Sequence, residues 1–193
     1  LESGGVKCWG RGFSGALGTD NTTDVGDGNP NWTPMAQLGT INLGATAVAI
    51  TAGWHSSCAL FDSGDVKCWG FNNWGQLGTG DLVNVGDGQP DSRSMADLSP
   101  INLTAAATAV STGGRHTCVI LDGGDVTCWG YAFYGQLGND RSESWVLDMV
   151  VPVNLLGATA TAISAGSLHT CAIVVGGHLK CWGHGGNGRL GFD

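Results

Sequence analysis

Charged residues are scarce in this 193-residue chain, and basic ones are scarcer still. Lys and Arg together number 8 against 16 Asp and Glu, which gives a formal net charge of −8. Because nucleic acids and anionic membranes are bound through clusters of basic side chains, neither is an expected partner. Long hydrophobic runs are lacking too: stretches such as Ala105–Val110 are far shorter than the roughly 20 residues that cross a bilayer. We therefore expect no membrane insertion.

The sequence motifs of common catalytic sites are absent as well. There is no Gly-x-Ser-x-Gly elbow, no His-Glu-x-x-His pair and no Walker loop. The glycine-rich segment Gly183–Gly188 is equivalent to Gly70–Gly75 in an internal repeat, which is described below. A nucleotide-binding fingerprint would instead open a helix after a strand. We therefore predict a protein that is not an enzyme and that carries no cofactor.

Glycine and tryptophan, by contrast, are abundant, with 34 and 8 residues. The chain is too apolar and too rich in tryptophan for a disordered acidic tail. No Gly-X-Y period is present, so the glycines do not indicate collagen. High glycine, little charge and many tryptophans are typical of short strands joined by tight turns.

The chain is built from an internal repeat. Cys-Trp-Gly occurs four times, with periods of 60, 60 and 53 residues, and each copy is followed at a constant offset by Gly-x-Leu-Gly. Apolar residues alternate in short runs, as in Val48/Ile50 and Val66/Cys68, which is the periodicity of strands. Several short strands in a unit of this size indicate the blades of a β-propeller. The four motifs begin at Cys8, Cys68, Cys128 and Cys181.

This repeat resembles that of the regulator of chromosome condensation family, and the similarity covers almost the whole chain. The matching features are a strand ending in glycine, a cysteine-bearing hairpin, Cys-Trp-Gly and Gly-x-Leu-Gly. The resemblance implies an all-β propeller of the seven-bladed type, with about three and a half blades present here. The cysteines resemble those of secreted members. The predicted units are 1–44 (a half blade and a long loop), 45–104, 105–157 and 158–193 (a truncated blade).

Three and a half blades cannot close a seven-bladed ring, and an open propeller exposes strand edges and apolar faces. We expect the sequence to be a fragment of a longer chain. Two alternatives remain open. Two copies could complete one ring, or the end blades could pack on other proteins.

Six of the seven cysteines form three pairs with one spacing. A hairpin centred on Ser63, Gly123 or Gly176 places the two cysteines of a pair opposite each other. Facing Cβ atoms lie roughly 4.5–5.5 Å apart or closer, so a disulfide is geometrically possible. Free buried thiols are the alternative, and the spacing is too long for a zinc knuckle. The predicted disulfides are Cys58–Cys68, Cys118–Cys128 and Cys171–Cys181, with Cys8 unpaired.

Repeated disulfides imply an oxidising compartment. Three Asn-x-Ser/Thr sequons agree with this, and they begin at Asn21, Asn31 and Asn102. A single sequon is a weak signal. Together with the cysteines, the sequons favour a secreted or cell-surface glycoprotein.

The acidic loops and the histidines each allow a metal-binding and a structural interpretation. Asp24 and Asp27 in one repeat, and Asp87 in the next, lie in Gly-Asp-Gly loops that could supply oxygens to calcium. A turn with hydrogen bonds from the backbone to Asp explains these loops as well. His116 and His169 hold the same repeat position. We interpret both histidines as structural residues that hydrogen-bond a neighbouring turn, and we predict no metal site there.

The tryptophans fall into two groups. Those of Cys-Trp-Gly are expected to pack between blades. Others lie with further aromatic residues and an arginine in loops at one end of the blades, where exposed aromatic side chains form interaction surfaces. Packing of these loop residues on the next blade is the alternative. The expected core residues are Trp9, Trp69, Trp129 and Trp182; the candidates for partner contact are Trp54, Trp74, Arg115, Phe133 and Tyr134.

These patterns predict a disulfide-stapled extracellular module that binds a protein or glycan partner. The first alternative is a structural subunit of an extracellular filament or large assembly, which self-associates through open end blades. The second is an accessory domain of a longer enzyme.

Overall fold

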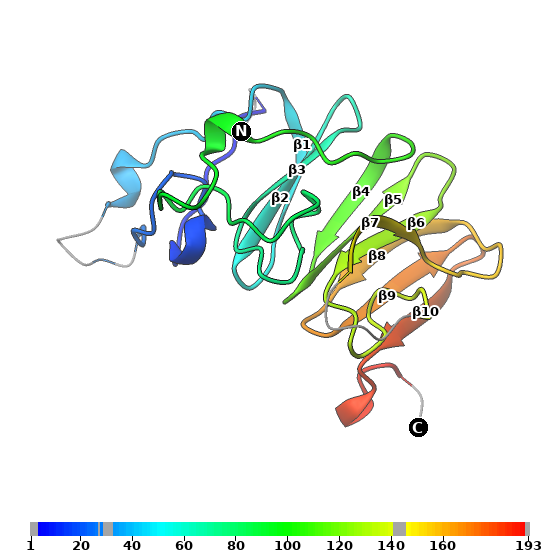
Figure 1. The fold of residues 1–193 in the computed structure, drawn as a ribbon. Coiled ribbons are helices and arrows are strands. Elements are labelled where there is room, and N and C mark those ends of the chain that lie inside the picture. The colour runs from blue at the N-terminus through cyan, green and yellow to red at the C-terminus, as the bar shows by residue number, and fades with distance from the viewer. Residues whose placement is uncertain (1–3, 27, 29–32, 141–145, 192–193) are drawn as a thin grey trace.

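The computed structural model describes residues 4–26, 28, 33–140 and 146–191 of the chain, with the side chains of 146–151 excepted. Three antiparallel sheets stand side by side like the blades of a fan (Figure 1), two of them with three strands and one with four. No helix among these residues is long and apolar enough to cross a bilayer. The arrangement is part of a β-propeller, as the repeat predicts.

Each sheet follows the chain in order, and short turns join its first three strands. The first sheet contains β1 (Ala47–Ala52), β2 (Ser56–Phe61) and β3 (Val66–Gly70). The second contains β4 (Ala107–Thr112), β5 (His116–Leu121), β6 (Val126–Gly130) and β7 (Val146–Pro152). The third contains β8 (Ala160–Ala165), β9 (His169–Val174) and β10 (His178–Gly183). Short 3-10 turns lie at η1 (Phe13–Gly15), η2 (Met35–Gln37), η3 (Met95–Asp97) and η4 (Gly186–Gly188).

The cysteine pairs lie at facing positions of the three hairpins. Cys58 pairs with Cys68 across β2 and β3, with Cα atoms 4.0 Å apart. The other two hairpins repeat this register, and all three predicted disulfides are formed. Cys8 is free, as expected, and burial raises its pKa to about 11 against an opposing hydrogen bond with Ser57.

A repeated pair of hydrogen bonds holds each blade to the one before it. Nε1 of Trp129 in β6 donates to the backbone carbonyl of Gln76 at 3.0 Å. The hydroxyl of Thr117 in β5 donates to the same carbonyl at 2.9 Å. We call this arrangement the inter-blade latch. It recurs with Trp69 and Ser57 on the carbonyl of Ala16, and with Trp182 and Thr170 on that of Gln136.

The latch explains the second glycine of Gly-x-Leu-Gly. Gly78 has a φ of +69°, and a Cβ there would lie 2.7 Å from Nε1 of Trp129. Only a residue without a side chain leaves room for the indole and adopts this backbone conformation without strain. The final glycine of the motif is therefore part of the blade interface.

The prediction for the core tryptophans is correct for two of the four and wrong for one. Trp69 and Trp129 are fully buried between blades, and Trp182 is half-buried. Trp9 is instead 64% exposed. The burial of a Cys-Trp-Gly tryptophan depends on a Gly-x-Leu-Gly turn from the preceding repeat, and no such turn packs on Trp9 among the described residues.

His116 is a buried structural residue, as predicted, but its partner lies in a strand, β9, and not in a turn. Its Nε2 lies 2.8 Å from Oγ1 of Thr170 in the following blade, and Thr170 donates its own proton to the Gln136 carbonyl. Nε2 is therefore the donor, and the neutral ring carries its proton there. Burial, and to a lesser extent the charge of His169, lowers the pKa of His116 to about 3.

Candidate partner-binding surface

Loops from successive repeats meet at one end of the blades. The first residue after each of the last three Cys-Trp-Gly motifs is tied by its backbone N–H to the turn between the first two strands of the same blade. Phe71 donates to the carbonyl of His55 at 2.9 Å, and Tyr131 to that of Arg115 at 3.0 Å. His184 bonds in the same way to Leu168. The backbone thus places equivalent loop residues next to equivalent turns in every blade.

A second set of bonds positions the aromatic residue before Gly-x-Leu-Gly. The backbone N–H of Trp74 donates to Oε1 of Gln76 at 3.0 Å, and that of Tyr134 to Oε1 of Gln136 at 2.9 Å. Both glutamines are buried, and their main-chain carbonyls accept the latch bonds. In these two repeats a single glutamine therefore supports both the blade interface and the exposed loop.

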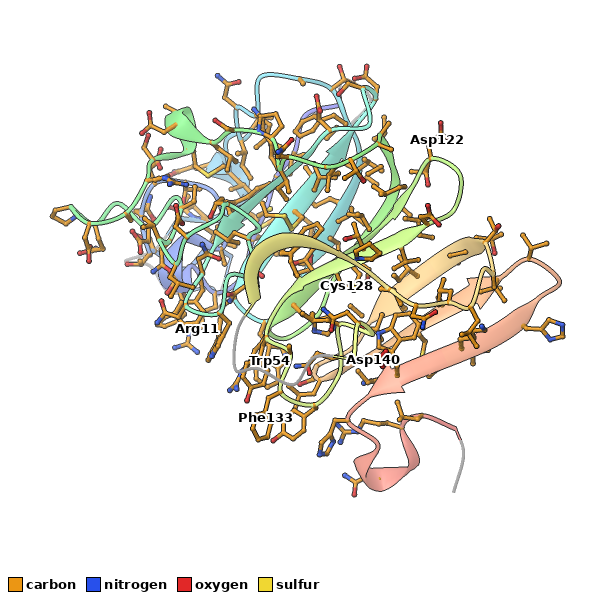
Figure 2. The ribbon with its side chains drawn as sticks, turned by 45° about the vertical axis from the view of Figure 1, so that its right-hand side comes forward. Arg11, Trp54, Asp122, Cys128, Phe133 and Asp140 are labelled. Carbon is orange, nitrogen blue, oxygen red and sulfur yellow. A yellow bond between two sulfur atoms is a disulfide. The ribbon has the colours of Figure 1, made fainter. Side chains whose placement is uncertain are left out.

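The side chains of these loops form a continuous line of ring contacts across the blades, which we call the aromatic band. Phe71 and Trp74 meet edge to face at 5.1 Å between ring centroids, and Trp74 and Tyr131 at 6.2 Å. Figure 2 shows Arg11, Trp54 and Phe133 at the same end of the molecule. The band consists of Arg11, Phe13, Trp54, His55, Phe71, Trp74, Arg115, Tyr131, Phe133, Tyr134 and His184.

Arg115 lies at the middle of the band, among rings from two blades. Its guanidinium carbon is 4.2 Å from the ring centroid of Trp74, 5.4 Å from that of Tyr131 and 5.9 Å from that of Trp54. Cations are attracted to the faces of aromatic rings at such distances. The arginine therefore holds the first two blades' loops together and stiffens the centre of the band.

All five predicted contact residues lie in the aromatic band. Trp54 and Phe133 are 56% and 53% exposed, and Tyr134 is exposed as well. Trp74 is half-buried, because it packs on Arg115 and Tyr131 of the following blade. The alternative of packing on the next blade is thus correct for this one residue. That these side chains contact a partner remains a prediction.

Other band residues were not predicted as contacts. They include Phe71 and Tyr131, which link the exposed rings into one line. Their common signal in the sequence is the position directly after Cys-Trp-Gly. His184 holds this position too, and its ring meets Tyr134 at 4.6 Å.

Charge is distributed unevenly along the strands. The band contains Arg11 and Arg115, and the neighbouring His55 has its pKa lowered by burial and by the charge of Arg11. The acidic hairpin turns lie at the other ends of β2 and β5, and Figure 2 shows Asp122 opposite the labelled band residues. These turns contain Asp62, Asp65, Asp122 and Asp125. A strand of six residues spans about 20 Å, so the two charge groups are well separated.

Of the two described calcium candidates, Asp87 makes the local bond that the turn interpretation requires, whereas Asp24 bonds a backbone N–H twelve residues away. Asp24 accepts the backbone N–H of Gly12 at 2.8 Å. Asp87 accepts from the backbone of Gln89 and from Nδ2 of Asn84, both at 3.0 Å. Burial opposes the ionisation of Asp87, but hydrogen bonding, first from Ser92, outweighs it and lowers the pKa of that carboxyl. Within the described ranges, no three His, Cys, Asp or Glu side chains converge on a point; Asp27 lies outside them.

Two of the predicted glycosylation sites are on the surface. Asn21 and Asn102 are exposed, so both are accessible to modification. Asn31 lies outside the described residues. Glycan attachment at any of the three remains a prediction.

The repeat recurs in known proteins. The family profile described as "Regulator of chromosome condensation (RCC1) repeat" matches residues 47–76, 107–136 and 160–189, and a second profile with that description matches 63–120. The chain belongs to the RCC1 repeat family. It is 28% identical to the Ultraviolet-B receptor UVR8 of Arabidopsis thaliana, over 99% of this chain and 40% of UVR8. It is 32% identical to the human Probable E3 ubiquitin-protein ligase HERC3, over 95% of this chain and 16% of HERC3.

Solved RCC1 structures have the same fold. The chain superimposes on yeast RCC1 (Prp20), solved bound to Kap60, with a TM-score of 0.74 and 20% identity over 96% of this chain and 41% of that one. Human WBSCR16 gives a TM-score of 0.72 at 19% identity, with 91% and 42% coverage. The predicted all-β propeller of the RCC1 type is therefore confirmed. The chain spans about two fifths of the length of UVR8 and of each of these structures.

Proposed function

We propose that this RCC1-repeat chain is a non-enzymatic protein-binding module, and that its partner docks on the aromatic band. The observation that carries the proposal is the line of ring contacts, in which exposed Trp54 lies against the Arg115 cation and exposed Phe133 stacks on the neighbouring Tyr131. Trp, Tyr and Arg are the residues in which binding energy concentrates at protein interfaces. The loops rest on blades that are latched to one another and that each contain a disulfide within their own hairpin, so little ordering entropy opposes binding.

The relatives support a binding role. The structure of Prp20 was solved in complex with Kap60. A second structure of Prp20 was described together with its binding to Gsp1p and histones. HERC3 is named as a ligase, but this chain matches only 16% of its length. The similarity to this small part of HERC3 does not make the present chain a ligase. An accessory domain of a longer enzyme remains the alternative for this chain.

We place the module in an oxidising compartment, as a secreted or cell-surface protein. Three disulfides per 193 residues favour this location over a reducing one. The exposed positions of Asn21 and Asn102 are compatible with glycosylation there. Mass spectrometry of the protein from its source, before and after reduction and deglycosylation, tests the proposal; free thiols throughout would contradict it.

A second candidate function is assembly through the open faces of the first and last sheets. Val48 and Ile50 of β1 are 60% and 50% exposed, and Leu179 of β10 is 67% exposed. Exposed apolar side chains on a sheet favour association. Light scattering across a concentration series tests this candidate: Leu179→Glu should reduce any association, whereas a monomer at all concentrations would exclude it.

The binding proposal is tested by peptide display on the immobilised protein. Selected peptides should bind Trp54→Ala at least tenfold more weakly than the unsubstituted protein, because truncation of an interface tryptophan commonly costs more than 1.4 kcal/mol. Trp9→Ala is the matched control, because Trp9 is also an exposed tryptophan but makes no ring contact with the band. Equal affinity for Trp54→Ala and Trp9→Ala would contradict docking on the band.

A further inference from the structure

We propose that Arg115 is an anchor for a carboxylate of the partner, so that the aromatic band recognises an acidic segment with an apolar residue beside the acid. This inference rests on the proposed function and specifies the chemistry of its ligand. It draws on three observations: the packing of the guanidinium, its lack of an ion-pair partner and the distribution of charge.

The packing leaves only one edge of the guanidinium open. The rings of Trp54, Trp74 and Tyr131 surround it, and Nε is buried without a hydrogen-bond partner. The terminal nitrogens Nη1 and Nη2 are neither hydrogen-bonded within the described chain nor among its buried unpartnered atoms. They are therefore not fully buried, and Arg115 as a whole is half-buried. Two parallel N–H donors in this geometry match the two oxygens of a carboxylate.

No carboxylate from the described part of the chain pairs with Arg115. Within the described ranges the ion pair that forms is Arg93 with Asp81, and Arg115 has no acidic partner. Among the described residues most basic side chains form no ion pair, so what distinguishes Arg115 is its place among the rings at the centre of the band. Its charge is available there to a ligand.

The charge distribution favours binding of an acidic ligand at the end of the blades that carries the band. Arg11 lies at one end of the band and Arg115 at its middle. Asp62 and Asp122 lie in hairpin turns at the opposite ends of the strands. An acidic segment is therefore attracted to the band and repelled by the far end, which gives specificity in addition to affinity.

The surroundings of Arg115 define what should flank the acid. Exposed Trp54 contacts the guanidinium, and exposed Phe133 is stacked on Tyr131, one ring further along the band. An aromatic or aliphatic side chain next to the bound carboxylate buries apolar surface on them. A strongly acidic segment without such a residue should bind more weakly, because exposed charge pairs contribute little by themselves.

The test is selection from a displayed library of random 12-residue peptides, followed by affinity measurements with the synthetic peptides. We expect Asp or Glu next to an aromatic or aliphatic residue in the selected sequences. Arg115→Gln should weaken binding at least tenfold, and changing the selected acid to its amide should weaken binding to the unsubstituted protein by a similar factor. The two changes together should cost little more than either alone, because they remove the same interaction. Arg115→Lys should recover part of the affinity, since the charge remains but the paired donors do not.

Lys7→Gln is the matched control, because it removes one positive charge at an exposed position outside the band. Its effect should stay within twofold. Thermal melts of all variants establish that they are folded. Selected peptides without acidic enrichment, or acidic peptides that bind Arg115→Gln as well as the unsubstituted protein, would overturn the carboxylate anchor.

The outcomes separate this inference from the proposed function. Peptides that lose affinity on Trp54→Ala but not on Arg115→Gln would overturn the anchor and leave the band as the binding surface. A library that gives no binder sensitive to Trp54→Ala would contradict both proposals.

Discussion

Nε1 of Trp129 and the backbone carbonyl of Gln76 are joined by a 3.0 Å hydrogen bond that fastens one blade to the next. Trp129 is fully buried, and Gln76 also holds the loop that carries Trp74. The stability of the blade interface and the geometry of the aromatic band therefore depend on the same turn.

Removing this tryptophan should destabilise the fold. Trp129→Ala is expected to lower the free energy of unfolding by about 3–5 kcal/mol, as for other buried aromatic truncations. Trp9→Ala should change it by less than about 0.5 kcal/mol, because Trp9 is exposed. Urea unfolding of both variants measures the difference. Similar losses for the two would show that the latch does not hold the blades.

The latch also makes a prediction about glycine. A Cβ at Gly78 would lie 2.7 Å from the indole nitrogen of Trp129, whereas one at Gly135 would meet nothing within 4 Å. Both glycines have positive φ, +69° and +75°. Gly135→Ala should therefore lower the free energy of unfolding only by the backbone strain, about 1 kcal/mol. Gly78→Ala should lower it distinctly more, because its Cβ would also clash with the indole of Trp129. Melting temperatures measured side by side test this order, and its reversal would contradict the latch geometry.

Acid should weaken the fold through His116. Its pKa is about 3 in the folded protein and about 6.5 in an unfolded chain. The unfolded state therefore binds the proton first, so this contribution to stability is complete above about pH 6.5 and declines as the pH falls toward 3. The loss at pH 5 is about 2 kcal/mol.

The measurement is urea unfolding between pH 7 and pH 4.5 for the native chain and for His116→Ser, which carries the residue found at the equivalent Ser56. The variant should be less stable at pH 7 but should lose less stability on acidification. Parallel pH profiles for the two proteins would show that His116 does not remain neutral in the fold.

The sequence predicts those parts of the structure whose partners lie close together in the chain. The registers of the hairpins and the pairing of Cys58 with Cys68 follow from ten-residue spacings and turn residues. The latch was not predictable in the same way, because its acceptor is a backbone carbonyl. That carbonyl belongs to Ala16 in one repeat and to Gln76 in the next, so side-chain identity gives no signal. The error at Trp9 has the same origin, since its burial depends on another repeat.

The aromatic band was predicted only in part for a related reason. Exposed aromatics such as Trp54 and Phe133 are conspicuous in the sequence. The position that joins them is occupied by Arg11, Phe71 and Tyr131 in successive repeats, so no residue type marks it. The backbone bond that fixes this position in space, from Tyr131 to Arg115 for example, is evident only in the fold.

Amide hydrogen exchange with a display-selected peptide tests docking on the aromatic band most directly. Bound peptide should slow exchange in residues 71–74 and 131–134, where the band loops lie, and leave the hairpin turns at 62–65 and 122–125 unchanged. Slowed exchange in those turns, or on the exposed faces of β1 and β10, with the band loops unaffected, would contradict the proposed binding surface.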